Sequence, residues 1–427
     1  MPGHKGAPLL GVEALDITEI DGADSLYAAD GIIRDSEQNA SVLFGCPTYY
    51  ATEGSSQCIR AMMHLVGLFA RQTGEKPIIA AARNVHKSFL SAVALLDMDV
   101  TWLYPDNPNS YLSCRLTAEM VAASLASMAE KPTALYLTSP DYLGHIADIA
   151  AIADVCHRHG ILLLVDNAHG AYLRFLPTSQ HPMDLGADMC CDSAHKTLSA
   201  LTGAAYLHVS PAAPAILTNQ VKNALALFGS TSPSYIILQS LDALNADLAN
   251  NYTARLDDFI SLTQALKSRL RQNGYTLAGE EPFKLTLCTK PYGYDGQSFS
   301  QLLRDNGIEC EFADPDFVVM MLSPAIGEDG LSRLEAALTT IPQRPAIATK
   351  PPHFQSPTVA LSIREATLAP CETVSAAACV GRVLASPSVG CPPAVPIAIC
   401  GERLDDVTAA CFAYYGIETC TVVRESE

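Results

Sequence analysis

The stretch that most constrains the fold of this chain is an unbroken aliphatic run that ends in polar residues. Residues Ile161–Gly170 read ILLLVDNAHG. A strand that is buried on both faces of a parallel sheet has such a continuous apolar sequence. Open α/β sheets bind their ligands beyond the carboxyl ends of these strands. The sequence therefore predicts a functional site around Asp166.

A second segment, Asp192–Thr197 (DSAHKT), follows the strand-like residues Asp188–Cys191 and contains Lys196. Pyridoxal phosphate needs an anion beside its pyridinium nitrogen and an amine for its Schiff base, and Asp166 and Lys196 together supply both. Taken singly, Asp166 reads as a strand-end acid or a helix cap, and Lys196 as a solvated surface lysine. The pair favours the cofactor interpretation because other polar residues accompany it. These are His169, Ser193 and His195.

Short apolar segments alternate with helical patterns on both sides of this stretch. The predicted strands cover residues 42–45, 78–82, 101–104, 134–138 and 201–209. The predicted helices begin near residues 59, 89, 120 and 146. Such alternation predicts an α/β fold with a doubly wound, mainly parallel sheet.

Gly54–Ser55–Ser56 precede one of these helices. Free backbone amides and the helix dipole at such a start form an anion site. An ordinary capped helix explains the same residues equally well.

The chain changes character after the sheet region. Leucine spacing between residues 241 and 270 predicts long amphipathic helices, and we expect them to form one bent element. The proline-rich connection predicts a semi-rigid linker. The predicted divisions are an N-terminal segment (1–40), a large domain (41–240), interdomain helices (241–275), a small α+β domain (276–341), the linker (342–357) and a compact C-terminal tail region (358–427).

Composition excludes several classes of function. The net charge of −18 argues against a nucleic-acid partner, and it suits either a cationic substrate or solubility alone. No apolar run approaches the length of a membrane span, and Met1–Gly6 lacks the apolar region of a signal peptide, so we expect a cytoplasmic protein without a membrane partner. The 14 cysteines are scattered without a zinc-site spacing, which predicts reduced thiols and no metal.

Several motifs occur along the chain in a fixed order. They are Met1–Gly6 (MPGHKG), Asp16–Glu19 (DITE), His86–Ser88, Asp166–Gly170, Ser193–Leu198, Thr231–Tyr235 and Gly401–Glu402. With them the chain resembles, nearly end to end, the fold-type I pyridoxal-phosphate-dependent ornithine/lysine/arginine decarboxylases. The match is to the short subgroup, which has no N-terminal wing domain. The Ser-x-His-Lys-Thr segment is the most specific of these motifs, and the Gly-Ser-Ser segment is weak alone.

The resemblance implies a role for each matching residue. Lys196 forms the Schiff base, Asp166 pairs with the pyridinium nitrogen, and His86 stacks on the ring. Lys196 or His86 returns the proton to Cα. The implied catalytic residues are thus Lys196, His86 and Asp166. The implied cofactor-binding residues are Gly54, Ser55, Ser56, His86, Asp166, Ala168, His169, Ser193, His195, Lys196, Thr231 and Ser232.

The resemblance also implies a homodimer with shared active sites, or a higher oligomer. In this family the segment that matches Thr231 and Ser232 reaches the cofactor of the neighbouring subunit. The phosphate is held by residues that match Ser55, Ser56, Ser193 and His195. The chain starts at the family's opening motif without the helical segment that usually precedes it, so we expect a truncated or misassigned start.

Four positions depart from the family pattern. Glu53 stands where Asn is common, Asn167 where Glu is common, and Gly203 where Gln is common. Ala394 replaces the usual Gly of Pro-Pro-Gly-Ile-Pro. None of these residues matches the Schiff-base lysine, so they bear on the substrate and the efficiency rather than on cofactor binding.

We expect decarboxylation of a small basic amino acid (arginine, lysine or ornithine) to the corresponding polyamine-pathway amine. An aminotransferase or lyase on the same fold is the first alternative, and a non-catalytic homologue that binds no cofactor is the second. The sequence does not distinguish the three substrates. Candidates for binding the distal cationic group are Glu402, Glu53 and Asp141.

Overall fold

The structure is a computed structural model that describes residues 1–72, 74–105, 110–353, 357–387 and 394–425. The chain forms two compact units. One contains residues 1–80, 118–139 and 148–256, and the other contains residues 81–117, 140–147 and 257–427. The predicted division into six segments is a different partition of the chain and stays a prediction.

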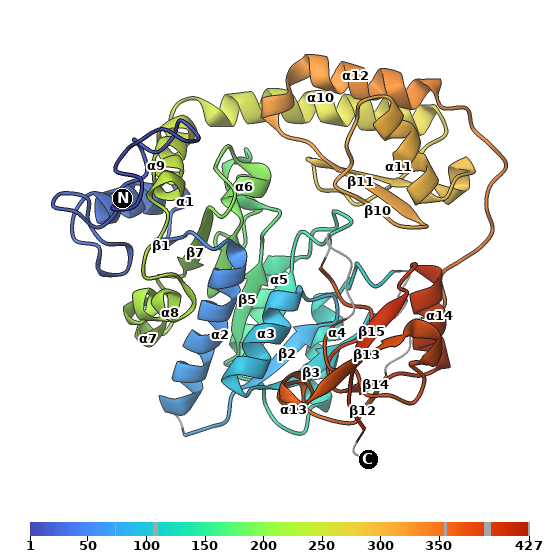
Figure 1. The fold of residues 1–427 in the computed structure, drawn as a ribbon, viewed down its shortest axis with the longest axis horizontal. Coiled ribbons are helices and arrows are strands. Elements are labelled where there is room, and N and C mark those ends of the chain that lie inside the picture. The colour runs from blue at the N-terminus through green and yellow to red at the C-terminus, as the bar shows by residue number, and fades with distance from the viewer. Residues whose placement is uncertain (73, 106–109, 354–356, 388–393, 426–427) are drawn as a thin grey trace. The chain divides into compact units, whose positions relative to one another are not determined.

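A seven-stranded sheet is the main feature of the fold (Figure 1), and its strand order is β1-β7-β6-β5-β4-β2-β3. Strands β4, β5 and β6 pair in parallel, whereas β7 runs antiparallel to both of its neighbours. The strands are β1 (Thr48–Ala51), β2 (Ile78–Ala82), β3 (Asp99–Leu103), β4 (Ala134–Thr138), β5 (Leu162–Asp166), β6 (Met189–Asp192) and β7 (Ala205–Val209). The predicted α/β class with a mainly parallel sheet is confirmed.

Strand β5 is buried along its whole length, as its aliphatic sequence predicts. It lies between β4 and β6, with Asp166 opposite Thr138 on one side and Cys191 on the other. The carboxyl ends of these three parallel strands therefore meet at one edge of the sheet.

Helices of the first unit cover this sheet. Helix α2 packs on β1, β6 and β7 and against α8, whereas α5 packs along β5 with α4 beside it. The helices of this part are α1 (Ile32–Phe44), α2 (Ser55–Gln72), α4 (Ala118–Ser127), α5 (Ile149–Arg158), α6 (Ala194–Thr197), α7 (Ala215–Asn219), α8 (Val221–Phe228) and α9 (Tyr235–Ala249). Helix α10 (Tyr252–Gln272) continues into the second unit.

Two sequence predictions in this region are wrong. Residues 42–45 are not a strand, because they form the end of α1 and its cap, Gly45, which has a left-handed backbone (φ 72°). Residues 241–270 are not one bent helix, because α9 and α10 are separate and Asn251 between them is also left-handed (φ 62°). Both breaks occur at residue types that adopt this conformation most readily.

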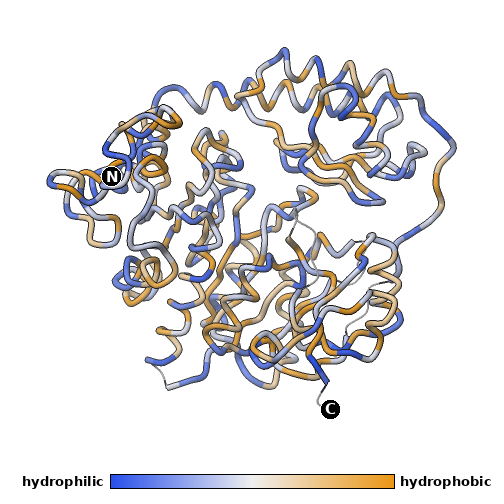
Figure 2. The backbone as a smooth tube through the Cα atoms, in the orientation of Figure 1, coloured by the Kyte–Doolittle hydropathy of each residue, from blue (hydrophilic) through white to orange (hydrophobic). Residues whose placement is uncertain are grey.

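The second unit contains a small antiparallel sheet with the strand order β10-β11-β9-β8, which confirms the predicted small α+β domain. Along α10 and α12, apolar and polar residues alternate in the helical pattern of an amphipathic surface (Figure 2). The elements are β8 (Thr276–Ala278), β9 (Lys284–Cys288), α11 (Gly296–Asp305), β10 (Phe312–Ala313), β11 (Phe317–Met321) and α12 (Gly327–Thr340).

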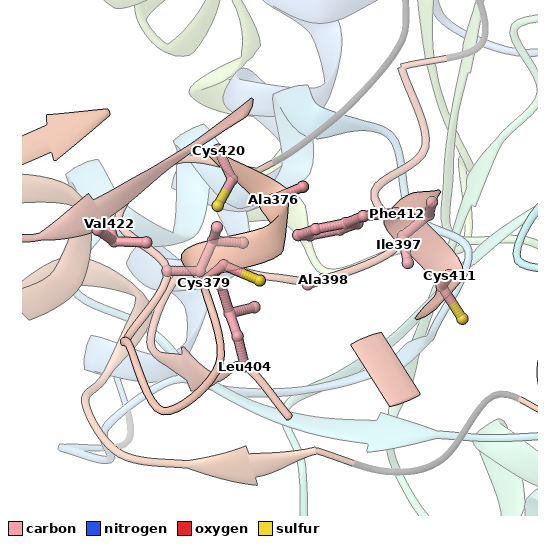
Figure 3. Close-up of a cluster of buried hydrophobic side chains, with 10 residues drawn as sticks. Ala376, Cys379, Ile397, Ala398, Leu404, Cys411, Phe412, Cys420 and Val422 are labelled. Carbon is pink, nitrogen blue, oxygen red and sulfur yellow. The ribbon is translucent and has the colours of Figure 1, made fainter. Parts of the chain in front are cut away.

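The C-terminal region has its own apolar core, drawn in Figure 3. It consists of Ala376, Cys379, Leu384, Ile397, Ala398, Leu404, Cys411, Phe412, Cys420 and Val422. The surrounding elements are β12 (Thr358–Val359), α13 (Ile363–Leu368), β13 (Cys371–Ser375), β14 (Glu402–Arg403), α14 (Asp406–Tyr414) and β15 (Thr419–Val423). Cys391–Pro393 of the tail motif and residues 354–356 of the predicted linker lie outside the described residues.

Polar contacts join this C-terminal region to helix α3 (Lys87–Leu96) and the turn before it. The guanidinium of Arg83 donates to the Glu402 carboxylate at 3.2 and 3.3 Å. The backbone N–H of Lys87 donates to the carbonyl of Ala394 at 2.9 Å. The start of α3 is therefore held by residues from the far end of the sequence.

Two features of the described residues agree with the composition. The 13 cysteines in this part of the chain are all free, as the scattered pattern predicts. None of the helices among the described residues is both long enough and apolar enough to cross a membrane.

The turn between β10 and β11 yields a prediction about stability and pH. Asp314 is only 4% exposed, and its Oδ1 accepts the N–H groups of Asp316 (2.8 Å) and Phe317 (2.7 Å). Burial raises the pKa of Asp314 to about 7, against about 3.9 in an unfolded chain. A carboxyl with a raised folded-state pKa stabilises the fold below its unfolded pKa, and that stability is lost as pH rises to 7.

We therefore expect Asp314→Asn to be more stable than the wild type at pH 8 by about 3 kcal/mol. The amide keeps the acceptor for both N–H groups and removes the buried charge. The difference should shrink toward pH 4 in urea unfolding curves. Asp305→Asn, at an exposed site on α11, is the control and should change the curves little at either pH. An Asp314→Asn protein with wild-type stability at pH 8 would contradict the assignment.

Candidate active site

Asp166 lies at the carboxyl end of β5 and is 3% exposed. The hydroxyl of Tyr136, on β4, donates to Asp166 Oδ2 at 3.2 Å, and the backbone N–H of Ala168 donates to Oδ1 at 3.1 Å. Burial raises the pKa of Asp166, and the positive charge of Lys196 acts in the opposite direction. A buried carboxylate with so few donors is stabilised when a cation faces it.

Lys196 lies on the short helix α6, which follows the carboxyl end of β6. Its Nζ is 3.1 Å from Nε2 of His169, a buried residue in the loop after β5. The loops that leave two adjacent parallel strands thus bring an amine, an imidazole and a carboxylate to the same edge of the sheet. Of the side chains that the sequence singled out, Asp166 ends β5, His169 lies in the loop after it, and Lys196 lies on α6 after β6.

Two serines join the start of α2 to this edge. The Ser193 hydroxyl donates to Ser55 Oγ at 2.8 Å, and Ser55 is the first residue of α2. Gly54 has a left-handed backbone (φ 71°), and its N–H donates to the carbonyl of Gly203 at 2.8 Å. The half-buried Ser56 follows on the same first turn. The first turn of an 18-residue helix has backbone N–H groups without helical partners, which is suitable chemistry for a phosphate.

His195 uses one ring nitrogen within the fold. Its Nδ1 donates to the carbonyl of Ala204 at 2.9 Å. Burial lowers the pKa of His195 and favours the neutral ring. With its proton on Nδ1, a neutral His195 has an acceptor at Nε2, so donation to a phosphate would require a second proton.

The other predicted site residues are placed by different elements. His86 is the N-cap of α3 in the second unit, and its Nδ1 accepts the N–H of Ser88 at 3.1 Å. Ala168, in the loop that follows Asp166, is buried. Thr231 and Ser232 lie in the exposed loop between α8 and α9.

Two of the three candidates for the distal group have carboxylates engaged within the chain. Glu402 is bound by Arg83 and by the N–H of Ile399 at 2.6 Å. Asp141 accepts the side chain of His145 at 2.9 Å and also the N–H of Leu143. Glu53 is exposed at the turn before α2.

Sequence reasoning missed Tyr136 and Asp192. Tyr136 lies in the middle of the mostly apolar strand β4, and its hydroxyl reaches Asp166 on the neighbouring strand. Asp192 precedes the Ser-x-His-Lys segment and is fully buried. The only signal in the sequence was a polar residue in a buried strand, which does not identify its partner.

Comparisons with known proteins show the family of this chain. The model described as "Orn/Lys/Arg decarboxylase, major domain" matches residues 6–284. The arginine decarboxylase of Bacillus subtilis is 30% identical, with 95% of this chain and 88% of that protein covered. The arginine decarboxylase of Halalkalibacterium halodurans is also 30% identical, with 96% and 88% covered.

Solved structures show the same fold. The lysine decarboxylase LdcF of Francisella novicida superposes with a TM-score of 0.79 at 16% identity, and 99% of this chain and 78% of that chain are covered. The constitutive lysine decarboxylase of Escherichia coli gives a TM-score of 0.76 at 17% identity, with 99% and 79% covered.

The contact between Gly54 and Gly203 yields a second prediction. Gly203 has φ 98°, and a Cβ there would lie 2.7 Å from the carbonyl oxygen of Thr52. We expect Gly203→Ala to shift the turn before α2, to destabilise the protein by about 1–3 kcal/mol and to weaken binding of pyridoxal phosphate about tenfold, or ~1.4 kcal/mol. The measurement is a thermal melt together with an absorbance titration.

Gly186→Ala is the matched control. Gly186 has a similar φ of 100°, but a Cβ there would meet Ala153 at 3.1 Å rather than the α2 turn. It should lose stability without losing cofactor affinity. Equal affinities of the two variants would show that the Gly203 turn does not shape the anion site.

Proposed function

This chain belongs to the Orn/Lys/Arg decarboxylase family, and we propose that it releases the α-carboxylate of arginine as carbon dioxide, with pyridoxal phosphate bound through Lys196. The family expected from the ordered motifs is confirmed, and with it the decarboxylation of a basic amino acid. Arginine is preferred because the curated relatives with that activity in their names align over 90% to 96% of this chain, whereas two lysine decarboxylases align over 57% and 58%. The observation that carries the proposal is that the buried Asp166 ends β5 and that Lys196 follows the adjacent parallel strand β6, with its Nζ 3.1 Å from His169 in the loop after β5.

The chemistry of the residues fits pyridoxal phosphate. A buried carboxylate suits the ring nitrogen, a lysine amine suits the aldehyde, and the Gly54–Ser55 turn with Ser193 suits the phosphate. When bound, the cofactor supplies an electron sink for the electron pair that the departing carboxylate leaves on Cα. Each of these assignments follows from the donor set and from the resemblance of the motifs.

Asp166 would hold a proton on the ring nitrogen. Burial already disfavours its isolated negative charge, so a cationic N–H beside it is stabilised. Tyr136 and the Ala168 amide orient the carboxylate, because each donates to a different oxygen.

Lys196 and His169 would transfer the protons of the lysine ammonium and of the substrate Cα. With Nε2 of His169 only 3.1 Å from Nζ, the imidazole can accept a proton from the ammonium and leave an amine that is able to act as a nucleophile. Once substrate binds, the released Lys196 amine can carry a proton to Cα. His86, by resemblance, would stack on the ring and is the second candidate for this proton transfer.

The proposed assembly is a homodimer with shared sites. Thr231 and Ser232 lie in an exposed loop, where they are accessible to a second copy of the chain. By resemblance this loop would reach the cofactor phosphate of the partner.

Lys196→Ala tests the covalent link. We expect the purified variant to lose the visible absorbance of the lysine-bound cofactor and to lose decarboxylation by at least about 1,000-fold. Lys131→Ala, at an exposed lysine before β4, is the control and should keep both. If the visible absorbance of Lys196→Ala equals that of the wild type, another residue carries the cofactor.

A substrate panel tests the reaction. With arginine, lysine and ornithine, we expect carbon dioxide release without formation of a keto acid, and a kcat/KM for arginine at least about tenfold above the other two, or ~1.4 kcal/mol. Keto-acid formation would identify an aminotransferase instead. A protein that binds no cofactor and releases no carbon dioxide would support a non-catalytic homologue.

A further inference from the structure

Asp192, the last residue of β6, is fully buried and accepts hydrogen bonds from four side chains, of which the Cys190 thiol is the most distant donor at 3.6 Å. The Asn167 amide donates to Asp192 Oδ1 at 2.7 Å. The Nε2 atoms of His181 and His208 both approach Asp192 Oδ2 at 3.0 Å. The asparagine and the two histidines are buried with it, and we call Asp192, Asn167, His181 and His208 the Asp192 network.

The network crosses the sheet in the order of its strands. His208 lies on β7, and its Nδ1 is 2.9 Å from the hydroxyl of Thr48 on β1. A path of side-chain hydrogen bonds therefore runs from β1 through β7 and β6 to the residue after β5. His181 joins from the loop after Phe175, and the Phe44 ring packs against both imidazoles, with centroids 5.7 and 4.6 Å away.

Burial and the two histidines act in opposite directions on the pKa of Asp192. Burial by itself raises the pKa of Asp192, but the two histidines outweigh it and hold that pKa below its usual range. Burial lowers the pKa of His208. The carboxylate thus remains ionised in the protein interior and needs its donors, because an unpartnered buried charge costs several kcal/mol.

The two ends of the network adjoin the candidate active site. Asn167 directly follows Asp166, and its backbone N–H donates to the carbonyl of Cys191 at 3.0 Å. On the other side, Asp192 directly precedes Ser193, which is bonded to Ser55, and α6 with Lys196 follows. The hydrogen bond between Asn167 and Asp192 therefore joins the loop that follows Asp166 to the turn that precedes Lys196.

A metal site at the same place fits the contacts less well. His181, Cys190 and Asp192 have donor atoms within 4.8 Å of one another. However, Asp192 already accepts hydrogen bonds from the three other residues of the network, and the Cys190 thiol donates to its Oδ1 at 3.6 Å. Four hydrogen bonds therefore already occupy the carboxylate oxygens that a metal would need.

We propose that Asp192 is a positioning residue, which through Asn167 sets the place of the Lys196 turn relative to Asp166. This inference rests on the proposed function for the role of the lysine and the cofactor. The network acts on the site through the two segments that it joins, the loop after Asp166 and the turn before Lys196, and not by contact with the substrate.

Asp192→Asn, which keeps the shape and removes the charge, tests this inference. The matched control is Asp188→Asn at the other end of β6. Asp188 also pairs with a histidine, His157 (3.0 Å), and accepts the N–H of Leu163 (2.7 Å). Each variant is compared with the wild type by thermal melting, by hydrogen exchange of residues 193–198 in the cofactor-free protein, by the Kd of pyridoxal phosphate, and by visible circular dichroism per bound cofactor.

We expect Asp192→Asn to speed exchange at residues 193–198, to raise the Kd at least about tenfold and to change the circular dichroism, whereas Asp188→Asn loses stability alone. If Asp192→Asn matches Asp188→Asn in exchange, Kd and circular dichroism, Asp192 only stabilises the fold and the proposal is wrong. Stoichiometric zinc in the purified protein would also overturn it, because the same atoms would then be metal ligands.

Asn167→Ala provides a second route if Asp192→Asn does not fold. It removes the bond that joins the two loops and leaves both histidines on the carboxylate. We expect the same faster exchange at residues 193–198, and unchanged exchange would reject the proposal. If the wild type binds no pyridoxal phosphate, the proposed function fails, and the exchange measurement on the cofactor-free protein still decides the positioning role.

Discussion

The burial of the Asp166 carboxylate is the constraint on which the candidate active site depends. Asp166 ends an apolar strand, where its ionised form is costly unless donors or a cation face it. Its neighbours come from three places in the sequence: Tyr136 on β4, Ala168 in the following loop and Lys196 beyond β6. Because these groups are brought together only where parallel strands end side by side, the sheet topology and the chemistry are linked.

Two adjacent strands thus end in buried acids with different surroundings. Asp166 ends its strand at the sheet edge from which the Lys196 helix also departs, and its buried carboxylate is suited to a cationic ring nitrogen. Asp192 accepts hydrogen bonds from four side chains, so its hydrogen-bonding capacity is used within the fold. An aspartate can therefore take part in the chemistry at one strand end and hold the backbone in place at the next. The groups around each carboxylate determine which role it has.

How far the sequence predicts this structure depends on the range of each signal. The aliphatic run of β5 and the nearby polar motifs are local, so the sheet and the prominence of Asp166 and Lys196 were predictable. The four residues 42–45 were too few to separate a strand from a helix, and only the exposure of Val42 (80%) beside the buried Phe44 shows the helical phase. Tyr136 and Asp192 were missed because their partners depend on strand register, which one sequence does not specify.

The contacts of Arg83 have a consequence for how relatives of this protein exchange segments. Arg83 lies just before α3, and Glu402, far along the chain, supplies its counter-charge. A hybrid that joined this sheet to a foreign C-terminal region lacking an acid at that place would leave an arginine cation buried without compensation. The C-terminal region therefore cannot be exchanged independently of the segment before α3. A recombinant would be tolerated only where Arg83 and its acidic partner are inherited together.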